Sequence, residues 1–249
     1  MNIPLMSLLV FIVAALYSSA GFGGASGYLI VMNFFGVPAN IMASTALLLN
    51  IFVSSISFAN YHKAGHFRSK LLVPFLITSI PAAFLGGRIE LSSEAYSVLL
   101  YGVLTYLALR MVFFPTITEA PDWIARPVPL WAALASGAGI GLLSGILGIG
   151  GGIFLSPLII LMGWGNSKQA AASAGGFIAI NSLSGLLSRV THGTFEIGEF
   201  GIPMLIVGLL GALIGSLLGA VHFSSAGVRR ALGTILTVAV GSFWISFFQ

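Results

Sequence analysis

The sequence predicts an all-α polytopic membrane protein made of two inverted repeats, each with five apolar segments. Three observations predict this fold class: a very low charge content, apolar runs of helix length along the whole chain, and a glycine-rich motif that occurs twice. Of the 249 residues, 57% are hydrophobic and only 6% are charged. A soluble domain carries about 25% charged residues. So few charges could not cover a surface that faces water, so lipid must be the main solvent.

Ten apolar segments follow one another along the chain. They fall at residues 3–20, 26–37, 40–61, 71–88, 95–114, 130–147, 153–164, 170–190, 199–221 and 227–248. Most have the roughly 17–25 residues that a membrane-spanning helix needs. The second and seventh segments are shorter, and each follows a glycine-rich motif. We therefore expect short or broken helices at these two places, either spanning or re-entrant.

A polar stretch between the fifth and sixth segments divides the chain. It contains four prolines by Pro129 and the densest acidic cluster, which is typical of an extramembrane linker. The predicted organisation is a first transmembrane repeat at 1–114, a cytoplasmic linker at 115–129 and a second transmembrane repeat at 130–249.

The two halves align with each other through residues that apolar sequences do not share by chance. The matches are glycines, prolines and serines: Gly21-Phe22-Gly23-Gly24 with Gly148-Ile149-Gly150-Gly151, Gly36 with Gly163, Ser55-Ile56-Ser57 with Ser182-Leu183-Ser184, Pro74 with Pro203, and Gly86 with Gly215. Five segments per half, of which the first two enter and leave on one side, predict that the repeats are inverted.

The basic residues support this topology. Lys63, Arg68 and Lys70 follow the third segment, whereas the basic loop of the second half, with Arg229 and Arg230, follows the ninth. By the positive-inside rule, loop 62–70, the linker and loop 221–230 are cytoplasmic. We therefore expect a multi-pass protein of the cell (inner) membrane with both termini outside.

Several function classes fit the sequence poorly. There is no G-x-S-x-G motif, and all four histidines fall in predicted loops, so we do not expect an enzyme. No cysteine is present, and the apolar segments hold no His, Asp or Glu cluster, so no metal and no cofactor is predicted. The net charge of +4 comes from residues at segment ends rather than from a stripe, which argues against nucleic acid.

The candidate substrate-binding residues are glycines of the two motifs and small polar residues of the segments next to them. They are Gly21, Gly23, Gly24, Ser26, Ser44, Thr45, Asn50, Gly148, Gly150, Gly151, Gly152, Ser173, Asn181 and Ser182. Glycines at a helix break allow close approach of a ligand to the backbone, and hydroxyl and amide groups can donate to it. The alternative is that the glycines serve helix packing and the serines bond between helices or to their own helix.

The predicted solute is an anion. No carboxylate lies in the middle of a segment, whereas helix N-termini, free backbone N–H groups and hydroxyls all suit negative charge. Arg88, Lys168 and Arg189, near segment ends, would either attract an anion or act as snorkelling or topology-setting charges.

The sequence resembles the sulfite exporter TauE/SafE family, also called the toluene sulfonate uptake permease family. The resemblance rests on Gly148-Ile149-Gly150-Gly151-Gly152, on Ser44-Thr45-Ala46 and Ala172-Ser173-Ala174, and on Gly211-Ala212-Leu213-Ile214-Gly215. It implies transport of sulfur-containing or organic anions such as sulfite, sulfonates and sulfoacetate. The first half departs from the pattern, since Ala25-Ser26-Gly27 stands where a third glycine is expected and Ile30 stands opposite Pro157.

We therefore predict a monomeric or dimeric transporter whose partners are a small anionic solute and the lipid bilayer. The solute would bind near the midplane between the two glycine-rich breaks. The alternatives are a passive anion channel and a membrane scaffold that transports nothing.

Overall fold

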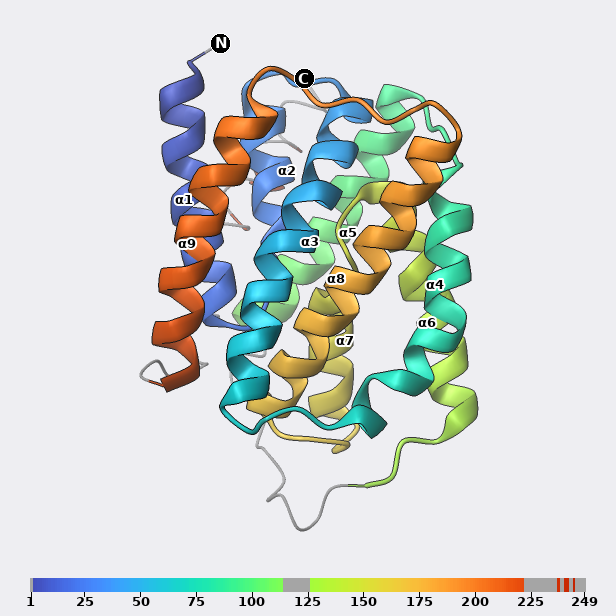
Figure 1. Ribbon diagram of the computed structural model, residues 1–249. Coiled ribbons are helices and arrows are strands. Elements are labelled where there is room, and N and C mark those ends of the chain that lie inside the picture. The colour runs from blue at the N-terminus through green and yellow to red at the C-terminus, as the bar shows by residue number, and fades with distance from the viewer. Residues whose placement is uncertain (1, 114–125, 222–236, 238–239, 242–243, 245–249) are drawn as a thin grey trace.

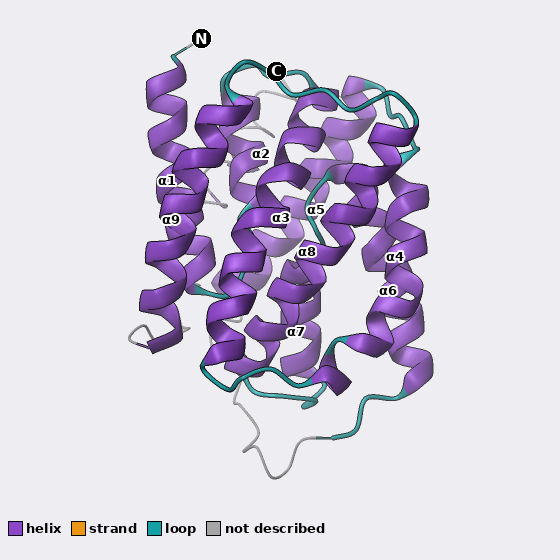
Figure 2. Cartoon of the chain, viewed as in Figure 1, coloured by secondary structure: helices purple, strands orange, loops and turns teal. Residues whose placement is uncertain are grey.

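Each apolar segment within the described residues forms a helix. The computed structural model describes residues 2–113 and 126–221 and four positions beyond them, 237, 240, 241 and 244. Its helices are α1 (Ile3–Ser19), α2 (Ala25–Phe34), α3 (Ala39–Lys63), α4 (Val73–Gly87), α5 (Ser93–Phe113), α6 (Leu130–Leu147), α7 (Gly152–Leu161), α8 (Ser167–Thr191) and α9 (Gly201–Val221). A short 3₁₀ turn, η1 (Ser69–Leu71), precedes α4. Over this part of the chain, the predicted all-α class is confirmed (Figure 2).

Two of the predicted segments fall mostly outside the described ranges. Most of the predicted linker 115–129 lies there, and so does most of the tenth segment, 227–248.

The two longest helices, α3 and α8, pack against each other in the middle of the bundle (Figure 1). Each has 25 residues, which corresponds to about 37 Å of helix. Following the colour gradient in Figure 1, α3 runs away from the end that carries the N-terminus, and α8 runs toward it. Most of the buried polar side chains lie on these two helices.

The second and seventh helices are too short to cross a bilayer. α2 and α7 have 10 residues each, or about 15 Å, against a hydrocarbon core of about 30 Å. α1 and α2 form a pair whose outer ends lie at one end of the bundle, and α6 and α7 form a pair whose outer ends lie at the opposite end (Figure 1). Each pair therefore forms a helical hairpin whose turn lies inside the bundle.

Glycine stripes join helices from different halves of the chain. Gly211, Gly215 and Gly219 of α9 lie against the backbone of α1, and a β-carbon at Gly215 would collide with the carbonyl oxygen of Ala15. Gly137, Gly141 and Gly145 of α6 lie against α4 in the same way. Spacing of four residues puts each set on one helix face, so the backbones approach closely, as in GxxxG pairs. Packing is thus the role of these glycines, including Gly211 and Gly215.

The outer surface is apolar, as a bilayer requires. Four of the described helices, α3, α6, α8 and α9, are long and apolar enough to cross a membrane. Large apolar side chains point outward from the bundle, among them Trp131, which is 76% exposed, and Ile202, which is 65% exposed. Lipid can cover such side chains at no cost, whereas water cannot.

One residue that we predicted in a loop is helical: His62 lies in the last turn of α3. Arg189, which we predicted near a segment end, lies in the last turn of α8. Both helices continue beyond the predicted segment ends, because long side chains near a helix end can be accommodated without ending the hydrogen-bonded ladder. Arg189 is also only 6% exposed, so it neither snorkels to the surface nor acts as a loop charge.

Candidate functional site

Both glycine-rich motifs break the chain inside the bundle and start a short helix there. Gly24 precedes α2 with φ +93°, and Gly151 precedes α7 with φ +78°. This left-handed conformation is strained for residues with a β-carbon, and neither helix start has a side-chain cap. The two short helices therefore begin with their first backbone N–H groups unprotected by side chains.

The two breaks come together at one side chain, Asn50 of α3. A β-carbon on Gly23 would lie 2.7 Å from Asn50 Oδ1, and one on Gly150 would lie 2.9 Å from Asn50 Nδ2. The same two positions crowd Cγ2 of Ile178 on α8, at 3.0 Å and 2.6 Å. Residues 127 positions apart in sequence thus face the same small volume. The prediction that the motifs lie together fits this geometry.

Asn50 is fully buried, and only one of its two polar side-chain atoms has a hydrogen-bond partner. Its Nδ2 donates to the carbonyl oxygen of Gly148 at 3.3 Å, whereas its Oδ1 has no hydrogen-bond partner. The Oγ of Ser182 lies 3.0 Å from the β-carbon position of Gly150 and also has no partner. Buried polar atoms are normally paired, so unpaired ones between two helix breaks indicate a place for a bound water or solute.

Backbone donors are free at the same place. In the part of the chain that the structure describes, the N–H groups of Gly23, Gly24, Gly150 and Gly151 have no acceptor. Successive N–H groups at the start of a helix create a positive local potential, which suits an anion.

A small cavity of about 10 Å³ separates the two breaks. Gly23, Gly24 and Ser26 line it from the first motif, and Ile149 and Ile153 line it from the second. This volume holds about one water molecule. The space between the breaks is therefore too small for a solute in this conformation.

The first break carries hydroxyl groups in place of the missing third glycine. Ser26 Oγ donates to Tyr17 Oη at 2.8 Å. The hydroxyl of Tyr28 is buried beside Gly24 and has no partner. The tyrosines were not among the predicted site residues, because a tyrosine in an apolar helix looks the same in sequence whether it faces the core or the membrane interface.

The remaining predicted residues differ in their surroundings. Gly21 packs on Ala171, Gly148 on Ala43, and Gly152 on Ala174 and Ile178. Ser44 and Thr45 are fully buried without a hydrogen-bond partner. Ser173 and Asn181 donate to carbonyls of their own helix, at Gln169 and Phe177. The contacts at the two breaks therefore centre on Gly23, Asn50, Gly150 and Ser182.

Side chains from other helices hold the end of α6, which leads into the second break. Each of the last three carbonyls of α6, and that of its cap residue, accepts such a hydrogen bond. The pairs are Arg189 Nη2 to Gly145 O (3.3 Å) and Ile146 O (3.1 Å), Tyr96 Oη to Leu147 O (3.0 Å), and Asn50 Nδ2 to Gly148 O (3.3 Å). These carbonyls have no partner within their own helix, and a cation at a helix C-terminus is favourable.

The end of α1, which leads into the first break, is held by neutral groups. Ser57 Oγ donates to Ser18 O at 3.4 Å, and Tyr61 Oη donates to Ser19 O at 3.0 Å. In both halves, then, the long central helix secures the helix before the break. Only the second half uses a charge.

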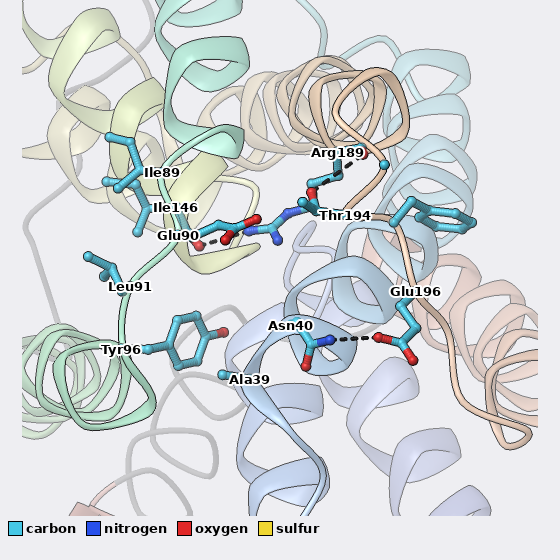
Figure 3. Close-up of a pocket in the computed structure, with 12 residues that line it drawn as sticks. Ala39, Asn40, Ile89, Glu90, Leu91, Tyr96, Ile146, Arg189, Thr194 and Glu196 are labelled. Atoms are coloured by element: carbon cyan, nitrogen blue, oxygen red, sulfur yellow. Dashed lines mark hydrogen bonds between the residues drawn. The ribbon is translucent and has the colours of Figure 1, made fainter.

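A larger cavity opens at the end of the bundle that carries the N-terminus. Its volume is about 400 Å³, and Arg189 lines it together with Asn40, Glu90, Tyr96 and Glu196 (Figure 3). Asn40 Nδ2 donates to Glu196 Oε2 at 2.6 Å across its mouth. The sequence alone does not reveal this cavity, because its lining comes from four helices, α3, α5, α6 and α8, and from the loops that follow α4 and α8.

Comparisons with known proteins indicate a membrane transporter. Residues 6–243 match the family model described as "Sulfite exporter TauE/SafE". A "probable membrane transporter protein" of Sinorhizobium fredii is 33% identical over 94% of this chain and 95% of its own. Another of that description, from Methanocaldococcus jannaschii, is 26% identical over 87% of this chain and 85% of its own. No solved structure matches significantly.

Proposed function

Because the chain belongs to the sulfite exporter TauE/SafE family of membrane transporters, we propose that it carries small sulfur-containing or organic anions such as sulfite, sulfonates or sulfoacetate. The solute binds near the midplane, between the two glycine-rich breaks. One observation carries this proposal: Gly23 and Gly150, from the two motifs, both lie against the buried, half-satisfied side chain of Asn50.

The chemistry of this place favours an oxyanion. The free N–H groups of the breaks and the hydroxyl of Ser182 donate hydrogen bonds to anionic oxygens. Asn50 Oδ1 is an acceptor and would repel a bare oxyanion oxygen, but it can accept a hydrogen bond from an anion that retains a proton. A monoanion that keeps one proton, such as hydrogen sulfite, satisfies both kinds of group, whereas a sulfonate satisfies the donors alone.

The proposed topology is a pair of inverted repeats, 1–114 and 130–249, joined by a cytoplasmic linker at 115–129. The opposite directions of α3 and α8 support it, and so do the two re-entrant pairs that open to opposite ends (Figure 1). Loop 64–68, the residues before α6 and the end of α9 lie at one end of the bundle. The positive-inside rule makes this end cytoplasmic and both termini external, in the inner membrane.

The small volume between the breaks favours a carrier over a channel. A space of about 10 Å³ admits one water but no sulfite, so the helices around the breaks must separate before a solute enters. A passive anion channel would need a continuous pore, and a scaffold would need no free donors at the breaks. Saturation and counterflow distinguish a carrier from both.

The test uses purified protein in liposomes, with labelled sulfite and a short alkanesulfonate as solutes. Asn50→Leu should lower the maximal flux about tenfold or more, because it removes the amide that bridges the breaks. Asn60→Leu is the matched control: it makes the same change on the same helix and removes a 2.8 Å bond to Ser216, away from the breaks. Equal flux in the two variants would contradict the proposed site. The absence of saturable counterflow from the unmodified protein would contradict carrier function.

A further inference from the structure

The 400 Å³ cavity at the N-terminal end of the bundle has a buried cation in its wall. Arg189 is 6% exposed, and its Nη2 donates only to the carbonyl oxygens of Gly145 and Ile146. Its Nε has no partner. Among the described residues no carboxylate lies within ion-pair distance of the guanidinium, although Glu90 is close enough to act on it electrostatically.

A buried guanidinium without a counter-ion is costly, because its charge has lost water and gained no opposite charge. Carbonyl oxygens replace part of the lost hydration for one nitrogen only. The missing interaction is an anionic partner with two oxygens, which matches the planar geometry of arginine.

The two carboxylates at the cavity do not fill this role. Glu90 and Glu196 are exposed, so water and salt screen them, whereas Arg189 is screened far less. Glu196 is also engaged by Asn40. Their negative charge disfavours a dianion more than a monoanion, so an acid bound beside Arg189 carries a single negative charge.

The cavity also has an apolar wall. Ile89, Leu91 and Ile146 lie together on one side of the cavity, next to the Glu90–Arg189 region (Figure 3). Its volume of about 400 Å³ lies within the roughly 300–1,000 Å³ that is usual for small-molecule sites, and it exceeds what an inorganic oxyanion needs.

We propose that this cavity is a second anion-binding site, separate from the midplane, which takes a monoanionic oxyacid with a short apolar body. Arg189 binds the acid group, and Ile89, Leu91 and Ile146 contact the apolar part. This goes beyond the proposed function, since binding here requires no transport. A free organic acid and the phosphate of an anionic lipid share this chemistry.

The experiment is calorimetric titration of the purified protein in neutral detergent with 1-butanesulfonate. Arg189→Gln should weaken binding about tenfold or more, the usual consequence of losing a charged hydrogen-bonding partner. Thr78→Val is the matched control, because it also removes a side-chain hydrogen bond to a carbonyl of α6, at Leu134, but lies outside the cavity and leaves the cation. It should bind as the unmodified protein does.

Two further variants keep the proposal testable if Arg189→Gln does not fold. Ala39→Phe places a ring into the cavity from its wall and should abolish binding. Glu90→Gln should strengthen binding, because it removes a competing negative charge. If Arg189 had only a structural role, this variant would not strengthen binding. Unchanged binding in Ala39→Phe, or binding that is lost equally in Thr78→Val, would overturn the proposal.

Two more experiments distinguish this site from the midplane site and from a lipid-binding site. A short alkanesulfonate is also a proposed transport solute, so Gly23→Ala, at the midplane, should leave only the Arg189-dependent part of butanesulfonate binding intact even where it stops transport. Either idea can therefore fail alone. In nanodiscs, replacing phosphatidylcholine with phosphatidylglycerol should abolish butanesulfonate binding if a lipid headgroup is the occupant, and leave it unchanged if a free acid is. The absence of binding in both phosphatidylcholine nanodiscs and detergent would refute the site.

Discussion

Replacing Gly23 by alanine should stop transport while leaving the protein folded. Gly23 does not have a positive φ, so alanine meets no backbone strain there. The new β-carbon would lie 2.7 Å from Asn50 Oδ1 and 3.0 Å from Ile178 Cγ2, and both atoms would have to shift by several tenths of an ångström. Overpacking of this kind costs about 1–3 kcal/mol. Alanine returns about 0.4–1 kcal/mol by restricting the unfolded chain. The net cost is therefore about 0–2.6 kcal/mol.

The assay pairs solute flux in liposomes with thermal unfolding of the same preparation. Gly139→Ala is the matched control: it makes the same change at an exposed glycine of α6 that has nothing within 4 Å of its β-carbon position. It should transport normally and unfold at an equal or higher temperature, because alanine favours helix. Gly150 is a poorer choice, since its φ of +78° adds strain to crowding. Normal flux in folded Gly23→Ala would refute the idea that solute passes between the two breaks.

Two other predictions concern topology and packing. The natural chain has no cysteine, so single cysteines at Lys63 and Thr191 should react with an impermeant label from opposite sides of the membrane; labelling from the same side would rule out the inverted arrangement. Gly215→Val should lower the yield of folded protein sharply, because its side chain would collide with the α1 backbone at Ala15, whereas Ile214→Val on the outer face should not; equal unfolding temperatures for the two variants would contradict the packing role.

The helices and their order could be predicted from hydropathy because lipid imposes a simple rule on sequence. Segment limits came within a few residues for each described helix, and the shortness of α2 and α7 followed from the glycines before them. The places of Gly24 and Gly151 as left-handed starts of helices could also be anticipated, since glycine adopts this conformation most easily.

The tertiary partners could not be predicted. Nothing in sequence tells that Asn50 faces both breaks while Asn181, equally buried, bonds its own helix. Arg189 resembled a charge at a helix end, because its acceptors, the carbonyls of Gly145 and Ile146, are 43–44 residues away and carry no side-chain signature. Such contacts depend on how helices rotate about their axes, which a strongly apolar sequence with little amphipathicity does not specify.

The glycine stripes decide which parts of the molecule can move as units. α9 packs closely against α1, and α6 packs closely against α4. Each helix pair, α1–α2 and α6–α7, therefore contacts a helix from the other half of the chain. The two halves are therefore interlocked. We expect any motion that opens the space between the breaks to move the α1–α9 and α4–α6 pairs relative to the central α3–α8 pair. The chain then passes between moving parts at the glycines that precede α2 and α7. The glycines at which the chain bends would then also be residues that bind the solute.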